Sequence, residues 1–134
     1  MTDPASPNSN SNDSLVEELV VAGAVTVRVV TFPAGRPADG QQLGQFVQAT
    51  AAANDGSNHI LLDMEHVHAI KGPFLGELLK LMKQLRGAGG SLKLCRLQQP
   101  IHDVMRVTRM EKLFECFADR EAALASVAAA HPAG

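Results

Sequence analysis

Apolar and polar residues alternate over residues 25–29, where three valines are separated by a threonine and an arginine. A period of two predicts a β-strand with one buried face. A short apolar patch at 19–21 precedes this run across Ala22-Gly23, so we expect a β-hairpin. The next segment, FPAGRPADG at 32–40, contains two prolines and two glycines, and we expect a loop there.

Residues 43–64 predict a helix followed by a central strand. Apolar residues recur at helical spacing from Leu43 to Thr50, and Asn54-Asp55-Gly56 supplies a C-terminal stop. The segment 59–64, HILLDM, is a short and nearly continuous apolar run. Such a run indicates a strand covered on both faces, which is typical of a parallel sheet.

A second amphipathic helix is predicted after residue 73. Its apolar stripe comprises Leu75, Leu78, Leu79, Met82 and Leu85. The polar residues on the opposite side are expected to face water, and they are Glu77, Lys80, Lys83 and Gln84. The glycine-rich segment 87–90 ends this helix.

The remaining residues predict two further strand and helix pairs. We expect a strand at 92–95, a helix from Pro100 to about Arg109, a short strand at 114–117, and an alanine-rich helix capped by Asp119. The fold class is therefore α/β, with a mixed and mostly parallel sheet of about four to five strands and about four α-helices.

We expect one folded domain over residues 17–130, because 134 residues are enough for one hydrophobic core. Residues 1–16 are polar and are expected to form a disordered tail, and 131–134 a flexible C-terminus. The first fourteen residues lack the basic start and apolar run of a secretory signal. We therefore expect a cytoplasmic protein without membrane insertion.

The formal net charge of −2 gives no electrostatic reason to expect a nucleic-acid partner. Cys95 and Cys116 lack metal-ligand spacing and are expected to be reduced thiols. His66 and His68 could lie on one face of an extended segment near Glu65. A zinc site needs a further ligand, for which only His59 or Asp63 is nearby, so we predict surface histidines and no metal. Cys95 and His102 could form a thiol-imidazole pair only if the intervening loop folds back.

From about Val25 to Ala128, the chain resembles the STAS domain family, which includes bacterial anti-sigma factor antagonists. The resemblance rests on residues 60–63 leading to Val67 and Ile70, on the motif LGELL at 75–79, and on RGAGG at 86–90. It continues with Leu113-Phe114 and the alanine-rich terminal helix. The family commonly carries D-S-S-G-L-G where this chain has Lys71-Gly72-Pro73-Phe74-Leu75-Gly76.

In the antagonists that the chain resembles, a serine aligned with Pro73 is phosphorylated by a partner kinase, and phosphorylation releases the antagonist from that kinase. Phosphate adds nearly two negative charges at a contact surface. Pro73 and Gly72 have no hydroxyl, and Lys71 reverses the charge of the expected aspartate. The resemblance therefore predicts no phosphorylation at the family site.

The same resemblance places a partner-binding surface at the start of the helix. We expect it to comprise Lys71, Gly72, Pro73, Phe74, Gly76, Glu77 and Lys80. By helical phase, Phe74 lies at the edge of the apolar stripe beside Leu81, and two alternatives are open for it. It is either a partly exposed anchor for a partner or a side chain packed under the preceding loop.

The leading functional hypothesis is a non-catalytic interaction module without cofactors, similar to an anti-sigma factor antagonist and binding a serine-kinase anti-sigma factor. A second hypothesis makes the chain a STAS subunit of a lipid-transport ABC system, partnered by its ATPase, or a signalling scaffold. A third makes it a small α/β enzyme or nucleotide binder that uses Gly72 and Cys95. A homodimer is compatible with all three.

Overall fold

A computed structural model of the 134-residue chain describes residues 15–34, 37–53, 59–71 and 73–132. Five strands form one sheet in the order β1-β2-β4-β6-β7, and two short strands, β3 and β5, form a second. The strands are β1 (Val16–Ala22), β2 (Val25–Thr31), β3 (Ala38–Asp39), β4 (His59–Asp63), β5 (Ile70–Lys71), β6 (Ser91–Cys95) and β7 (Glu115–Phe117). The helices are α2 (Gly40–Ala53), α3 (Phe74–Gly87), α4 (Gln99–Val107) and α5 (Arg120–Ala130), with a 3-10 turn η1 (Met110–Lys112).

The large sheet is mixed, as the sequence predicts. β1 and β2 form the expected hairpin and pair antiparallel, whereas β2, β4, β6 and β7 are parallel to one another. Gly23 turns the hairpin with φ of 64°, in the left-handed region that favours glycine. A Cβ at this position would lie 2.2 Å from the His131 carbonyl oxygen. The turn therefore has no room for a side chain at residue 23.

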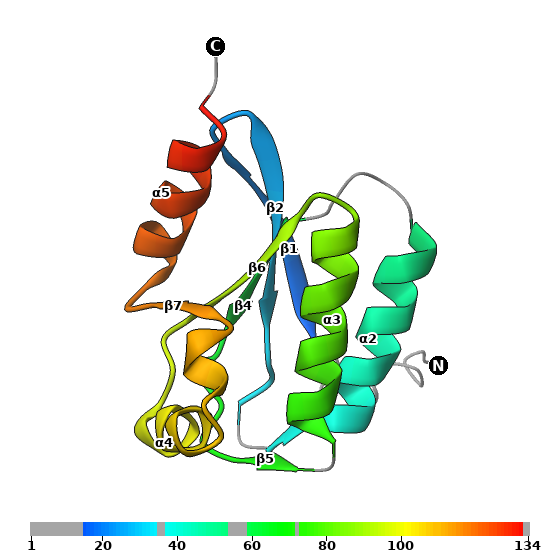
Figure 1. The fold of residues 1–134 in the computed structure, drawn as a ribbon, viewed down its shortest axis with the longest axis vertical. Helices are drawn as coiled ribbons and strands as arrows, with labels where there is room; N and C mark the ends of the chain where they lie inside the picture. Colours follow the sequence, from blue (N-terminus) through cyan, green and yellow to red (C-terminus); the bar gives the residue numbers. More distant parts are fainter. Residues whose placement is uncertain (1–14, 35–36, 54–58, 72, 133–134) are drawn as a thin grey trace, which may run out of the picture.

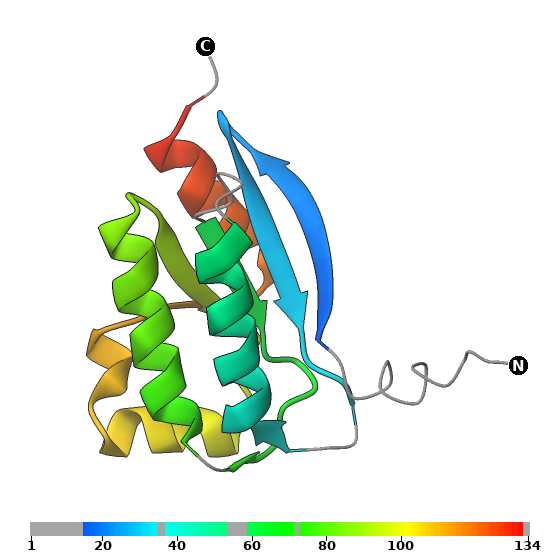
Figure 2. The same ribbon diagram turned by 90° about the vertical axis from the view of Figure 1, so that its right-hand side faces the viewer.

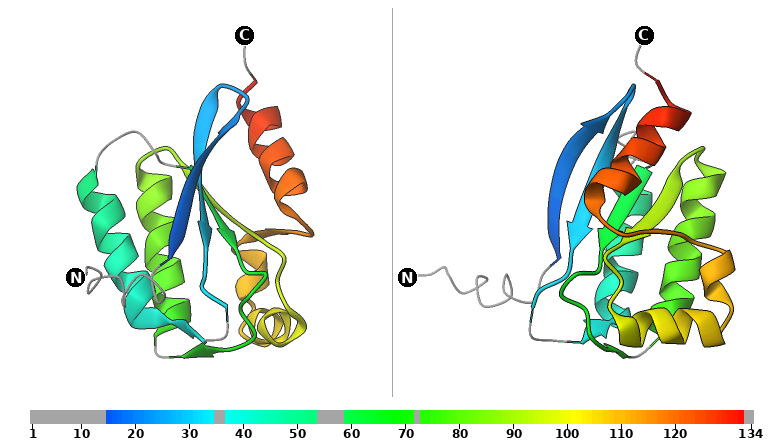
Figure 3. Two further views of the ribbon diagram at one scale, coloured as in Figure 1. Left: turned by 180° about the vertical axis from the view of Figure 1, so that it is seen from behind. Right: turned by 90° about the vertical axis from the view of Figure 1, so that its left-hand side faces the viewer.

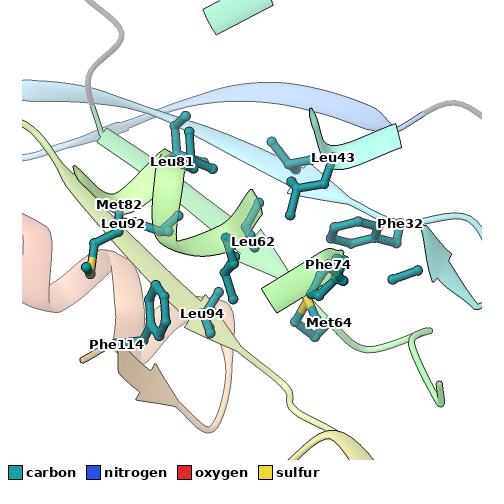
Figure 4. Close-up of a cluster of buried hydrophobic side chains, with 14 of the residues drawn as sticks. Phe32, Leu43, Leu62, Met64, Phe74, Leu81, Met82, Leu92, Leu94 and Phe114 are labelled. Atoms are coloured by element: carbon teal, nitrogen blue, oxygen red, sulfur yellow. The ribbon is translucent and has the colours of Figure 1, made fainter. Parts of the chain in front are cut away.

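Helices cover both faces of the sheet (Figure 1). α2 and α3 lie side by side on one face and α5 lies on the other, as Figures 1 and 2 both show. The larger buried cluster lies beneath α2 and α3 and includes Phe32, Leu62 and Leu94 (Figure 4). The smaller one lies beneath α5 and includes Val29 and Ala123. β4 is buried at all five positions, which confirms that it is a central strand.

The prediction of a loop over residues 32–40 was wrong in part. Its last residues form β3, which pairs in parallel with β5 in the registers Ala38 with Ile70 and Asp39 with Lys71. Two-residue strands leave no periodicity in a sequence, so the pairing could not be predicted. The predicted stop at residues 54–56 lies outside the described residues.

The apolar stripe of α3 is rotated from its predicted position. Its buried residues are Phe74, Leu78, Leu81, Met82 and Leu85, whereas Leu75 and Leu79 are half-buried. Glu77 and Gln84 do not face open water, because α2 lies beside them. The Gln84 side chain donates a hydrogen bond of 3.3 Å to the Val47 carbonyl oxygen. The prediction placed only one apolar face on this helix and could not anticipate a second helix along its flank.

Candidate functional site: the start of helix α3

The first turn of α3 is held against the first turn of α2. β3 ends directly before α2 and β5 ends two residues before α3, and their pairing brings Asp39 and Lys71 into register. At α2, the Asp39 carboxylate accepts a hydrogen bond of 2.9 Å from the Gln41 amide, as an N-cap does. A Cβ on Gly40 would lie 2.6 Å from the Phe74 nitrogen and 2.7 Å from the Pro73 carbonyl carbon. Only glycine fits this close approach.

Pro73 is the N-cap of α3, which begins at Phe74. Its carbonyl oxygen accepts a 3.0 Å hydrogen bond from the Glu77 amide, while no side chain caps the helix. The Pro73 side chain is exposed. The helix tip is therefore present, and its outermost side chain is a pyrrolidine ring without a hydroxyl.

Phe74 is buried and its side chain is not a surface anchor in this structure. It is 1% exposed and its ring meets that of Phe32 edge-to-face, with centroids 5.8 Å apart. Figure 4 shows both rings beside Leu43 and Met64. Of the two alternatives for Phe74, the structure shows the packed side chain. The buried stripe of α3 is centred on the side of the helix that carries Phe74.

Among the other residues of the predicted surface, Lys71, Gly76 and Lys80 are exposed. Glu77 is mostly covered: its side chain is 17% exposed, and a Cβ on Gly44 of α2 would lie 3.2 Å from its carboxylate. Lys80 pairs with Glu77 at 3.3 Å and is itself 69% exposed. Two lysines and the proline ring are thus accessible at this end of α3. Gly72 lies outside the described residues.

An ionic network at the carboxyl end of β4 was missed by the sequence analysis. Asp63 is fully buried, and its carboxylate accepts a 2.7 Å hydrogen bond from Arg120 Nε at the start of α5. Arg120 also donates to Thr31 at 3.0 Å and to Glu18 at 3.2 Å, so it joins the ends of three strands. The hydrogen bond to Asp63 raises the pKa of the Arg120 guanidinium.

Arg96 adds a second cation to this network. Its guanidinium lies 3.9 Å from the Asp63 carboxylate and 2.8 Å from that of Glu65. The backbone of Arg96 has φ of 57°, a conformation that costs energy for a non-glycine residue. An aspartate at the end of an otherwise apolar strand indicates that a positively charged partner lies nearby. No spacing rule in the sequence identifies Arg120 as that partner.

Cys95 is not available for nucleophilic chemistry. Its side chain is fully buried under α5, and burial raises the pKa of the thiol to about 12. It does not meet His102, which instead lines an open pocket of about 270 Å³. The pocket is lined by Arg96, Leu97, His102, Cys116, Phe117 and Ala118. Burial also raises the pKa of the Cys116 thiol, so neither cysteine is an activated nucleophile.

No group of three His, Cys, Asp or Glu side chains that could hold a metal ion occurs within the described residues. His66 lies 3.6 Å from the Glu65 carboxylate. Over the same part of the chain, no helix has the length and apolar character needed to cross a membrane.

Comparison with known proteins identifies the class. The family model for the STAS domain matches residues 12–123, and the chain belongs to the STAS domain family. A putative anti-sigma factor antagonist, BtrV of Bordetella bronchiseptica, is 30% identical over 85 residues, which cover 63% of this chain and 73% of that protein.

Solved structures share the fold. A putative anti-sigma factor antagonist from Thermotoga maritima superposes with a TM-score of 0.70 at 18% identity, covering 88% of this chain and 97% of that one. The unphosphorylated anti-sigma factor antagonist SpoIIAA gives 0.69 at 15% identity, with 87% and 97% covered. A sulfate transporter family protein from Wolinella succinogenes gives 0.64 at 13% identity, with 75% and 83% covered. This fold therefore occurs both in anti-sigma factor antagonists and in a sulfate transporter family protein.

Proposed function

We propose that the chain is an anti-sigma factor antagonist that binds a serine-kinase anti-sigma factor through the start of α3 and cannot be released by phosphorylation there. The contact surface comprises Lys71, Gly72, Pro73, Gly76 and Lys80. Phe74 supports it from within, and Glu77 orients Lys80. The observation that carries the proposal is the exposed Pro73 at the N-cap, where an ester-forming hydroxyl is chemically absent.

The charges of this surface favour an acidic partner. Lys71 and Lys80 are exposed, while the acids closest to them are engaged: Asp39 caps α2 and Glu77 is covered. Electrostatic complementarity of this kind sets specificity and association rate more than affinity. The module needs no catalytic group, because competition for the kinase would suffice to free the sigma factor.

Interferometry with the 134-residue chain and a purified serine-kinase anti-sigma factor from the same organism tests this proposal. We expect binding that is unchanged by ATP, and no added phosphate on the chain by mass spectrometry. Lys71→Glu should weaken binding at least about tenfold. Lys112→Glu, on η1, is the matched control and should change it little. Absence of binding, or release by ATP with phosphate on this chain, contradicts the proposal.

A gain-of-function variant sharpens the test. Lys71→Asp with Pro73→Ser restores the aspartate and the hydroxyl that the family commonly carries. Because Lys71→Asp alone should weaken binding as Lys71→Glu does, the single variant Lys71→Asp is the control for the double variant. We expect the kinase to phosphorylate this double variant and then to release it, because the phosphate adds negative charge to the contact surface. A double variant that binds but is never phosphorylated would argue that the partner is not a kinase of this type.

The transporter-like alternative predicts a different partner for the same fold. It is favoured only by the shared architecture of the sulfate transporter family protein, which shows the fold alone. Affinity purification of the native chain separates the two: recovery of an ABC-system ATPase without any anti-sigma factor would support the alternative.

A further inference from the structure

Strand β1 forms one edge of the large sheet and carries exposed apolar side chains. Val16, Leu19 and Val21 are 61%, 64% and 75% exposed. Figure 3 shows β1 in front of the sheet when the molecule is seen from behind, and among the described strands only β2 pairs with it. An edge strand offers a row of backbone donors and acceptors to another strand.

β1 lacks two of the residue types that commonly protect a sheet edge. The strand VEELVVA contains neither lysine nor proline, both of which discourage pairing between edges. Its two acids each lie in an ion pair within the chain, Glu17 with Arg28 at 2.7 Å and Glu18 with Arg120 at 3.2 Å, and Arg120 also pairs with the buried Asp63. A second strand is therefore compatible with these acids where its own acids do not lie directly opposite them.

Of the exposed apolar side chains, Leu19 and Val21 share one face of the strand, and Val16 lies on the other face at the start of β1. Val20 and Ala22 pack into the buried cluster beneath α5, and side chains alternate between faces along a strand. Leu19 and Val21 therefore project from the opposite face, next to Arg28 and Thr26, their partners in the hairpin register.

We propose that β1 pairs antiparallel with β1 of a second copy of this chain, about a two-fold axis at Val20. In that register, Leu19 of each copy lies opposite Val21 of the other. Glu17 lies opposite Gly23 and Glu18 opposite Ala22, so no two acids face each other. A two-fold interface uses the same patch twice, and this strand is complementary to itself.

Backbone geometry is compatible with that axis. Ala22 and Val25 flank the two-residue turn, so hydrogen-bonded pairs to β2 fall at Ala22 and at every second residue before it. The N–H and C=O groups of Leu19 and Val21 then point outward, where they can bond the second copy. Val20 would meet its counterpart as a non-hydrogen-bonded pair, with Cα atoms about 4.5 Å apart.

A second copy fits this edge better than the chain's own N-terminal segment. Residues 1–14 contain no valine, isoleucine, leucine or aromatic residue, and include two prolines. Such a segment has low β-propensity and cannot cover Leu19 and Val21 with apolar side chains. The pairing would extend the five-stranded sheet into one continuous sheet across both copies.

Sedimentation velocity of the full-length chain over about 1–200 µM tests the proposal, since a reversible dimer depends on concentration. We expect a dimer whose dissociation constant rises at least about tenfold in Leu19→Lys and in Val21→Lys. Val107→Lys is the matched control, because Val107 is 80% exposed on α4, and it should leave the dimer intact. A monomer throughout, or a dimer that survives Val21→Lys, overturns the proposal.

Cross-linking tests the register itself. In a Cys116→Ser background, Val20→Cys should form a disulfide-linked dimer on mild oxidation, because Cα atoms at that spacing suit a disulfide. Thr26→Cys, one strand further in, should not. Efficient cross-linking at residue 26 and none at 20 would contradict the register. Kinase binding by Val21→Lys should be normal, which separates this inference from the proposed function.

Discussion

Two regions at the same end of the sheet are held in place by different forces. At the start of α3, Gly40 and Phe74 lock two helix tips together by close apolar and backbone contact. At the start of α5, Asp63 and Arg120 form a buried ion pair. The contact at the start of α3 depends on close packing and leaves no room for an added atom. The ion pair at the start of α5 depends on charge, and removing one residue leaves the other without its counter-charge.

Phe74→Ala should have the largest effect. Removing a fully buried ring from the core costs about 3–5 kcal/mol of unfolding free energy, since Phe32 and its neighbours lose their contacts. Chemical denaturation measures the loss. Leu113→Ala, at a position 44% exposed, should cost less than about 1 kcal/mol. Equal losses at the two positions would contradict the burial of Phe74.

Asp63→Ala should come next, with a loss of about 3 kcal/mol, because it leaves the Arg120 guanidinium without its main partner. The double variant Asp63→Leu with Arg120→Met removes both charges and should recover part of the loss. A double-mutant cycle built from the denaturation midpoints of Asp63→Leu, Arg120→Met and the double variant measures the coupling. Additive losses would show that the ion pair is not the cause.

Gly40→Ala should cost about 1–3 kcal/mol, as overpacking does, because its Cβ would press on backbone atoms of Pro73 and Phe74. Gly76→Ala is the matched control. No atom lies within 4 Å of a Cβ there, so alanine in α3 should stabilise the protein by about 0.5–1 kcal/mol. Thermal melts give both signs, and a stabilising Gly40→Ala would contradict the close approach.

A smaller, pH-dependent effect is expected at the opposite end of β4. Burial, with the positive charges of His131 and Lys93, lowers the pKa of His59. The folded state then binds fewer protons than the unfolded one, so stability is present above the unfolded value near 6.5 and falls as pH drops below it. His59→Gln should lose stability less steeply between about pH 7 and 5. Identical slopes would contradict this.

The two regions also differ in what the sequence predicts. The start of α3 follows from local signals: a proline before a helical apolar pattern and a family resemblance around residues 71–76. The ion pair joins Asp63 to a residue 57 positions away, and no periodicity reports such a contact. β3 and β5 were missed because two residues are too few for a pattern. Whether Phe74 is exposed or buried depends on where α2 packs, and the sequence pattern does not give that position.

The proline at the tip of α3 has a consequence for regulation. A pyrrolidine ring restricts the backbone at φ of −81° in Pro73, so this segment has little freedom left to lose when a partner docks. If the chain binds a kinase as proposed above, no phosphate on Pro73 can release it. The extent of complex formation would then follow from the number of molecules synthesised and degraded, so a cell would tune this module through its abundance.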